Sequence, residues 1–388
     1  MESTTHMAEA RKPLEGVRVI DMTRVLSGPY CTALLADLGA EIIKIEGAQG
    51  DDYRHVGPFV EDESALFAAL NRGKSSIVLD LKGESGLAAM RHLVANADVL
   101  VENFRPGVMD RLGLGWETLS EINPRLVYAG ISGFGRFGPN ADQPAYDIIV
   151  QAMSGIMDAT GEPDGSPTMI GEPIGDVAAG LFAAWGIAVA LFDRERTGKG
   201  RLVDVGMFDA LLAMMPTLSA RHLGTGEAPR RVGNRHPLSA PFGVYAAGEG
   251  HFAVAVLNST LFERFARAIG SSELADDPRF ASDSLRRVNE PALAEVIERW
   301  AAPYSAAEAV AALIKAGIPA ATIQSVAEAW QSEQARDRQL WSEAGGRVPQ
   351  QPVHFSDALR GGVRRAPRLG EDQGRILAGI GMEQANDN

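Results

Sequence analysis

The chain has 388 residues, 45% of them hydrophobic and 22% charged, which is an ordinary globular composition. This length allows a large core and a division into about two or three domains. The formal net charge of −13 excludes general nucleic-acid binding, which requires a basic face. An anionic small ligand is still allowed, provided that arginine and lysine residues gather locally.

Residues 1–12 are polar and lack the apolar core of a signal peptide, so we expect a disordered N-terminal segment outside the fold. The single cysteine, Cys31, cannot form an intrachain disulfide, which indicates a reducing compartment. The longest apolar run, Ala178–Phe192, is shorter than the roughly 20 residues of a comfortable membrane span. We therefore predict a soluble, cytoplasmic protein with no membrane partner.

Short strands alternate with helices in the first third of the chain. In chain order, the predicted elements are a strand at 17–21, a helix at 28–38, a strand at 41–45, a strand at 76–81, a helix at 84–95, and strands at 99–101 and 126–129. This alternation predicts an α/β fold with a parallel sheet and helices on both faces. Ligands of such sheets bind outside the carboxyl ends of the strands.

Candidate binding loops leave these strand ends at Thr23–Ser27, Asn103–Gly107 and Gly130–Gly135. None of them matches G-x-G-x-x-G at a strand-to-helix turn, and no Walker A motif is present in the sequence. A nicotinamide-dependent dehydrogenase is therefore unsupported.

Asp176 stands where a region rich in glycine and proline, ending at Gly175, passes into the long apolar run. A carboxylate at a helix start lies near unpaired N–H groups and the positive end of the helix dipole, which favours its ionised form. Asp176 is either a nucleophile or an N-cap, because aspartate is among the preferred capping residues. Cys31 is a weaker nucleophile candidate, since it lies in an apolar helical pattern.

The second half of the chain contains a strand at 201–205, a helix to about Ala220, and a segment at 224–241 that is dense in glycine, proline and arginine. A smaller α+β unit follows and closes with a strand at 318–323. We expect residues 13–222 to form the first part of a large domain, 225–325 a small domain, and 326–388 a C-terminal segment returning to the large domain.

Several motifs in one order give the chain a resemblance to the class III CoA-transferase family, also called the CaiB/BaiF family, from Pro13 to about Gly381. The markers are Pro13–Gly16, Gly28–Pro29, Leu35–Glu41, Asn71–Lys74, Val101–Gly107, Tyr146–Asp147, Gly175–Asp176, Thr197–Gly200, Gly233–Pro237 and Pro278–Phe280. The resemblance implies a Rossmann-like parallel-sheet large domain, a smaller α+β domain and an interlocked homodimer.

The resemblance also implies a chemical role for Asp176. Its carboxylate would attack an acyl-CoA thioester, and CoA would pass to a free carboxylic acid through an aspartyl anhydride and an aspartyl-CoA thioester. Acyl-CoA and carboxylic acids would be the substrates, with no metal and no permanently bound cofactor.

Residues lining CoA are likewise implied by the resemblance. They are Leu26, Ser27, Leu79, Asp80, Leu81, Lys82, Asn103, Phe104, Arg105, Arg111, Tyr146 and Asp147. Lys82, Arg105 and Arg111 would supply charge for the phosphates and Phe104 an apolar face. A solvated surface position is the alternative for each cation, and core packing is the alternative for Phe104. Arg24, Arg72 and Lys74 are further candidates.

The chain departs from some members of this family. Formate-handling members carry a glutamine where Leu26 stands, and a glycine-rich lid that is not found here. This disfavours formyl-CoA and oxalate as substrates. The resemblance suggests longer, C4–C5 dicarboxylates such as succinate instead.

Two other functions stay open. One is a 2-methylacyl-CoA racemase, although Tyr146 stands where racemases carry histidine, and tyrosine (pKa about 10) is a poorer base than histidine (about 6.5). The other is a CoA-binding accessory subunit without chemistry.

Overall fold

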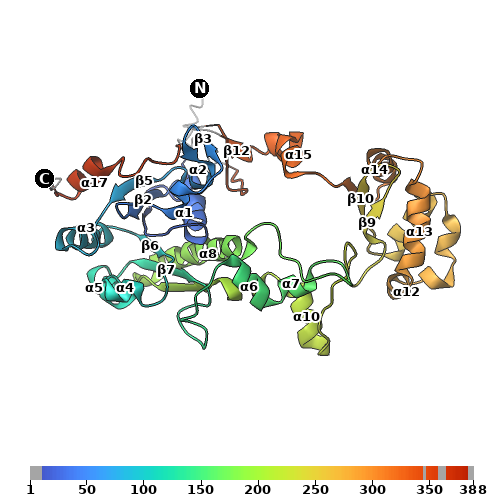
Figure 1. The fold of residues 1–388 in the computed structure, drawn as a ribbon, viewed down its shortest axis with the longest axis horizontal. Coiled ribbons are helices and arrows are strands. Elements are labelled where there is room, and N and C mark those ends of the chain that lie inside the picture. The colour runs from blue at the N-terminus through green and yellow to red at the C-terminus, as the bar shows by residue number, and fades with distance from the viewer. Residues whose placement is uncertain (1–10, 344–346, 357–363, 383–388) are drawn as a thin grey trace, which may run out of the picture. The chain divides into compact units, whose positions relative to one another are not determined.

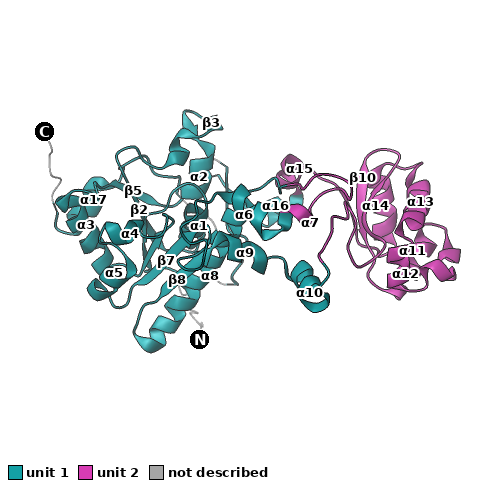
Figure 2. Cartoon of the chain, turned by 60° about the horizontal axis from the view of Figure 1, so that its bottom comes forward, with its two compact units in different colours: residues 1–156, 169–227, 333–388 teal, residues 157–168, 228–332 magenta. Residues whose placement is uncertain are grey.

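The computed structural model describes residues 11–343, 347–356 and 364–382, and the chain divides into two compact units (Figure 2). Unit 1 comprises residues 1–156, 169–227 and 333–388, and unit 2 comprises residues 157–168 and 228–332. The segment 157–168 thus differs from the expected domain division, which keeps all of 13–222 together. The reason is local: Gly233 N–H donates to the Gly161 carbonyl, and Arg231 pairs with Asp158 at 2.9 Å.

A six-stranded parallel sheet forms the centre of unit 1, in the order β5-β2-β1-β6-β7-β8 (Figure 1). Its strands are β1 (Arg18–Asp21), β2 (Glu41–Glu46), β5 (Ser75–Val78), β6 (Val99–Glu102), β7 (Val127–Ser132) and β8 (Leu202–Gly206). The predicted parallel sheet is confirmed.

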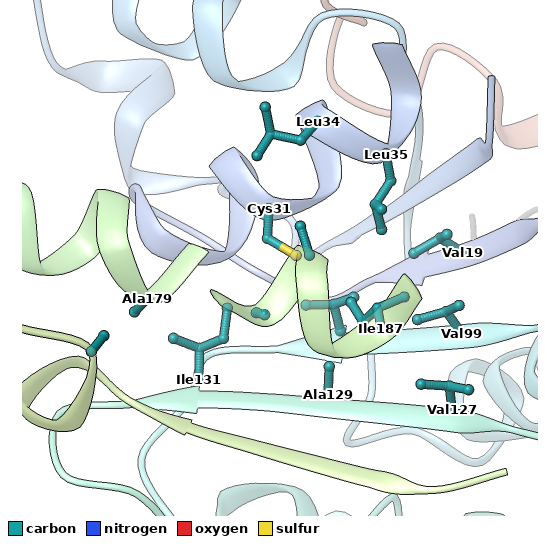
Figure 3. Packing of buried hydrophobic residues seen from close by; sticks show 14 of the residues in the cluster. Val19, Cys31, Leu34, Leu35, Val99, Val127, Ala129, Ile131, Ala179 and Ile187 are labelled. Carbon is teal, nitrogen blue, oxygen red and sulfur yellow. The ribbon is translucent and has the colours of Figure 1, made fainter. Parts of the chain in front are cut away.

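Alternate residues of these strands serve two separate cores, because successive side chains point to opposite faces of a sheet. Val19 and Val99 face α1 (Ser27–Asp37) and α8 (Ile174–Thr197), together with Leu35 and Ile187 (Figure 3). Their neighbours Ile20 and Leu100 face the opposite core, which is formed with α3 (Glu84–Ala95), α5 (Trp116–Ile122) and α17 (Gln373–Gly379).

The remaining elements of unit 1 are short. They are η1 (Asp52–His55), β3 (Phe59–Val60), β4 (Glu63–Ser64), α2 (Ala65–Asn71), α4 (Val108–Arg111), α6 (Asp147–Ser154), α9 (Met207–Ala213), α10 (Pro216–Thr225), α16 (Glu333–Asp337), β12 (Trp341–Ser342) and β13 (Val348–Pro349); α7 (Ile156–Ala159) spans the boundary with unit 2. The C-terminal segment is tied to the sheet by Asp372, whose Oδ2 accepts the Ser76 N–H at 3.0 Å.

Helix α8 has 24 residues and ends at Gly198, whose positive φ of 70° is the common helix-terminating conformation of glycine. Among the described residues, α8 is the one helix long and apolar enough to cross a membrane, and half of its apolar window is buried inside the structure. Its packing against α1 and the sheet is that of a core helix.

Unit 2 contains the antiparallel sheet β11-β10-β9 and a layer of helices. Its elements are β9 (Phe242–Ala246), β10 (His251–Ala255), α11 (Ser259–Ala268), η2 (Ser272–Ala275), η3 (Pro278–Phe280), α12 (Asp283–Val288), α13 (Glu290–Ala301), α14 (Ala306–Lys315), β11 (Ala320–Thr322) and α15 (Val326–Gln331). Phe252, Phe262 and Phe265 lie in its core.

Candidate active site

A cavity of about 190 Å³ lies in unit 1 where the carboxyl ends of β1, β6 and β7 meet the first turn of α8. Its lining residues are Arg24, Val25, Ser27, Asp52, Asn103, Phe104, Arg105, Pro106, Ile131, Ser132, Gly133, Ala141, Gln143, Ala145, Tyr146, Asp176 and Met207. The location agrees with the general rule for parallel sheets.

The cavity brings together some of the residues that the sequence nominates, and leaves others outside. Those that line it are Ser27, Asn103, Phe104, Arg105, Tyr146 and Asp176; those that do not are Leu26, Leu79, Asp80, Leu81, Lys82, Arg111 and Asp147. Leu26 and Leu79 are buried, whereas Asp80, Lys82 and Arg111 are exposed.

Asp176 lies in the first turn of α8, and the N-cap position belongs to Pro173, which makes no side-chain cap. The capping alternative for Asp176 is therefore wrong. The Asp176 carboxylate instead lies near Ser27, at the start of α1, whose hydroxyl and backbone N–H both act to lower the pKa of Asp176.

The acidity of Asp176 also differs from the expectation. Burial raises the pKa of Asp176 to about 6; the Asp147 carboxylate raises it too, and the Ser27 hydrogen bonds oppose both effects. A helix start alone favours the ionised form, but here desolvation outweighs that field. At neutral pH the carboxylate remains mostly ionised and is more basic than an ordinary aspartate.

Helices α1 and α8 cross very closely beside this carboxylate. A Cβ atom added at Gly180 would lie 2.5 Å from the Ser27 carbonyl oxygen and 3.0 Å from the Tyr30 ring. The absence of a side chain at Gly180 therefore allows Ser27 to reach Asp176, one turn of α8 away.

The loop from Thr23 to Ser27 carries the strain of the site. Val25 has φ of 68°, a conformation that is an outlier for a β-branched residue and persists only when its surroundings enforce it. Its N–H donates to Asp51 Oδ1 at 3.1 Å, and Lys44 Nζ donates to the Thr23 carbonyl at 2.7 Å.

Two buried ion pairs lie beneath this loop. Lys44 pairs with Asp51 at 2.8 Å and Lys74 pairs with Asp21 at 2.9 Å, and all four side chains are fully buried. Burial alone would raise the pKa of Asp21, yet Lys74 and Lys44, with the Thr23 and Thr32 hydroxyls, lower it to about 2. Lys74 thus serves the interior of unit 1, and its candidacy as a phosphate ligand is wrong.

Arg72 is likewise engaged inside unit 1. It is buried, and its guanidinium donates to Asp37 at 2.6 Å and 3.0 Å. The guanidinium therefore serves the packing of α1, and its candidacy for CoA binding is also wrong.

Asn103 fixes the other side of the strained loop. Its Oδ1 accepts the Arg24 N–H at 3.0 Å, and its Nδ2 donates to the Arg24 carbonyl at 2.8 Å and to Ser27 Oγ at 3.3 Å. Asn103 therefore contacts the same Ser27 hydroxyl that lowers the pKa of Asp176. The Asn103 side chain therefore holds the loop 23–27 in place and also lines the cavity.

The loops after β1 and β6 bring two exposed cations and an aromatic ring to the cavity. The Arg24 guanidinium lies 5.6 Å from the centre of the Phe104 ring, within the range of a cation–π contact. Arg24 and Arg105 both line the cavity and are exposed, so both are available to an anionic ligand.

Glu102 is a buried group that sequence reasoning missed. Its Oε2 accepts the Phe104 N–H at 2.8 Å, and its Oε1 lies 3.8 Å from Arg136 and 3.3 Å from the Tyr128 hydroxyl. Burial raises the pKa of Glu102 to about 7. Glu102 links the loop after β6 to the loop after β7, and the only sequence signal for it is its place at a strand end.

The cavity-lining residues that the sequence did not nominate singly are Val25, Asp52, Pro106, Ile131, Ser132, Gly133, Ala141, Gln143, Ala145 and Met207. Val25, Pro106 and Ile131–Gly133 lie in loops that the strand-end rule marks as candidates. The rest come from elements whose approach depends on tertiary packing.

Within residues 11–343, 347–356 and 364–382, no group of three or more histidine, cysteine, aspartate or glutamate residues could hold a metal ion. Cys31 is fully buried, and burial raises the pKa of its thiol far above the usual range. A reactive thiolate at Cys31 is therefore excluded.

The family described as CoA-transferase family III matches residues 14–373. The acetyl-CoA:oxalate CoA-transferase of Acetobacter aceti is 48% identical over 355 residues, covering 91% of each chain. The succinate–glutarate CoA-transferase of Agrobacterium fabrum is 37% identical, covering 96% of this chain and 97% of the relative. A crystal structure of a CaiB/BaiF family protein from Brucella suis has a TM-score of 0.86 and 39% identity, covering 95% of this chain and all of the other.

Proposed function

This chain belongs to CoA-transferase family III and is a CoA-transferase, and we propose that it transfers CoA through covalent intermediates on Asp176. The observation that carries this proposal is the position of the Asp176 carboxylate. It lines the cavity at the sheet edge, and its pKa is raised to about 6. The named influences on that pKa are burial, Ser27 and Asp147, none of which is cationic. A carboxylate without a cationic partner keeps its basicity and can act as a nucleophile.

The proposed reaction begins when an Asp176 oxygen attacks the thioester carbonyl of an acyl-CoA. The carbon–sulfur bond breaks, leaving an aspartyl–acyl anhydride and a CoA thiolate. The thiolate then attacks the aspartyl carbonyl, which releases the first acid as its carboxylate and forms an aspartyl-CoA thioester.

The acceptor carboxylate next attacks this thioester, regenerating an anhydride and the thiolate. The thiolate then attacks the acceptor's acyl carbonyl, which forms the new acyl-CoA and frees Asp176. The Ser27 donors keep the carboxylate in place during these steps, and water must be excluded because both intermediates hydrolyse.

For the acids, we propose dicarboxylates. The relatives are named for oxalate, succinate and glutarate, which all carry a second carboxylate. Arg24 and Arg105 line the same cavity as Asp176 and could bind that second charge. Leu26 argues against oxalate by resemblance, whereas the relative at 48% identity is named for oxalate. A screen of acetyl-CoA and succinyl-CoA against these acids, read by liquid chromatography, decides between them.

We propose that CoA itself lies along the carboxyl edge of the sheet, toward the turn after β5. Lys82 and Arg111 are exposed and free to approach phosphates, and Phe104 offers an apolar face beside Arg105. CoA would enter only as a thioester substrate, with no permanently bound cofactor.

A homodimer, interlocked as the sequence resemblance implies, is also part of the proposal. Leu181, Trp185 and Phe192 follow one another along α8 and are 51%, 65% and 62% exposed. An apolar stripe of this size suits burial against a second copy. Light scattering of the wild type and of Trp185→Glu tests this. We place the protein in the cytoplasm, because its single cysteine is a buried thiol.

Asp176→Asn and Asp176→Ala test the covalent role. We expect CoA exchange to be abolished while CoA binding, measured by calorimetry, persists. Hydroxylamine trapping, or a mass increase on the Asp176 peptide during turnover, identifies the intermediates. Full activity in either variant would remove Asp176 from the mechanism.

A further inference from the structure

The geometry points to Asp147 as the positioning residue of the nucleophile: its carboxylate holds the first turn of α8 and places a second negative charge behind Asp176. This inference rests on the proposed role of Asp176. It replaces the role in CoA binding that the sequence suggested for Asp147.

The first oxygen of Asp147 replaces the missing cap of α8. Asp147 Oδ1 accepts the Gly175 N–H at 2.7 Å, and Gly175 directly precedes Asp176. A helix leaves its first N–H groups unpaired, and Pro173 at the N-cap supplies no side-chain acceptor. A side chain of α6 therefore caps the first turn of α8, and this hydrogen bond fixes the backbone next to Asp176.

The second oxygen continues the connection. Asp147 Oδ2 accepts from Gln151 Nε2 at 2.7 Å, and Gln151 Oε1 accepts the Ile170 N–H at 2.9 Å. Gln151 is 1% exposed, so this is an interior bridge. Both carboxylate oxygens of Asp147 thus accept hydrogen bonds from protein donors. These bonds connect α6 to α8 and to the segment that precedes α8.

Glycine at position 175 is needed for this approach. A Cβ atom there would lie 2.8 Å from Val150 Cγ2 and 3.0 Å from Asp147 Oδ1. Any side chain would push α6 and α8 apart and lengthen the bond between Asp147 and the helix.

The charge of Asp147 acts on the nucleophile directly. A nearby like charge disfavours ionisation, and Asp147 is among the causes that raise the pKa of Asp176. The other groups facing Asp176 are Ser27 from α1, which opposes the shift, and Tyr53 from η1, whose own pKa is raised by burial and by Asp176. Arg24, Asp52 and Arg105 line the same cavity. Asp147 thus keeps the attacking carboxylate more basic.

A charge swap separates the two roles. In D147N/Q151E, Asn at 147 still accepts the Gly175 N–H and donates its amide to Glu at 151, which still accepts the Ile170 N–H. These three hydrogen bonds can be kept, the long contact from Gln151 Nε2 to the Glu172 carbonyl at 3.5 Å is lost, and the negative charge moves from position 147 to position 151, one turn along α6. The single variant D147A removes both the cap and the charge, and Asp142→Asn, an exposed carboxylate of the segment that leads into α6, is the matched control.

We expect the swap to unfold between the wild type and D147A, because it keeps the cap but places a charge at a buried position. The acid limb of its kcat/KM profile should move down by about half a pH unit or more. D147A should unfold at a lower temperature and lose about 10- to 100-fold in kcat, because the nucleophile shifts. D142N should match the wild type in both measurements.

An unmoved acid limb in the swap would overturn the electrostatic role, and unchanged thermal unfolding of D147A would overturn the capping role. If Asp176→Asn retained activity, the proposed mechanism would fail, and the acid limb would no longer report Asp176. The unfolding comparison between D147A and the swap would still judge the cap, so the two failures are distinguishable.

Discussion

Two carboxylates at the carboxyl edge of the sheet, Asp21 at the end of β1 and Asp176 at the start of α8, have opposite acidities. Burial acts to raise the pKa of both. Asp21 is nevertheless lowered to about 2 by Lys74 and Lys44, whereas Asp176 stays at about 6. The difference shows that the partner's charge, rather than burial, decides which carboxylate becomes strongly acidic and which stays basic.

Removing Lys74, a cation beside the buried Asp21 carboxylate, should have the largest effect on stability. Lys74→Met leaves Asp21 buried with one lysine fewer, and we expect the free energy of unfolding to fall by about 3–5 kcal/mol, measured by urea titration. The neutral double variant Asp21→Asn/Lys74→Met should recover much of this loss, since no uncompensated charge remains. Equal losses in the two variants would mean that packing, not charge, dominates there.

Removing the Asp176 carboxylate should instead preserve or raise stability at neutral pH. Because the folded pKa of Asp176 (about 6) exceeds its ordinary 3.8, the folded state binds the proton more tightly, and stability falls as pH rises between these values. Asp176→Asn should therefore be at least as stable as the wild type at pH 7.5, and this advantage should vanish near pH 4. Urea titrations at both pH values provide the measurement; a variant less stable at pH 7.5 would contradict the assignment.

For Asp21 the sign is reversed. Its stabilising contribution is present above pH 3.8 and is lost as pH falls toward 2. On acidification, the ion pair between Asp21 and Lys74 should therefore break only near pH 2.

The smallest expected effect concerns the Ser27 hydroxyl, one of the two Ser27 groups that lower the pKa of Asp176. Ser27→Ala removes a hydroxyl that lowers the pKa of Asp176, so the acid limb of kcat/KM should move up by about half a pH unit. Thr32→Ala, which removes a donor to Asp21 Oδ2 at 2.7 Å, is the matched control and should leave the acid limb in place. A limb that moves in both variants would point to a general loosening of α1.

Local patterns in the sequence predict the parallel sheet well, because strands such as β1 and β6 are short apolar runs between turn signals. The position of Asp176 at a helix start next to the cavity also follows from sequence. The pKa of Asp176 could not be predicted in the same way. The sequence indicates the helix dipole, but desolvation depends on how α1 and the loop 23–27 pack around the carboxylate.

The buried lysines are hidden from sequence reasoning for a related reason. Lys44 interrupts an apolar strand and would normally be assigned to a solvated position. Only the tertiary approach of Asp51 and Thr23 makes its burial favourable. Asp147 likewise sits in a motif suggestive of ligand binding, and its turn toward Gly175 depends on how α6 meets α8.

The close helix crossing at Gly180 limits how this enzyme can be altered. Even one methyl group there would meet main-chain atoms of α1, which cannot move aside as a flexible side chain can. Libraries that diversify the cavity to change acid preference should therefore leave this position fixed, although it lines no part of the cavity. The lining of the cavity and the spacing of α1 and α8 beside Asp176 are thus set by different residues of the chain.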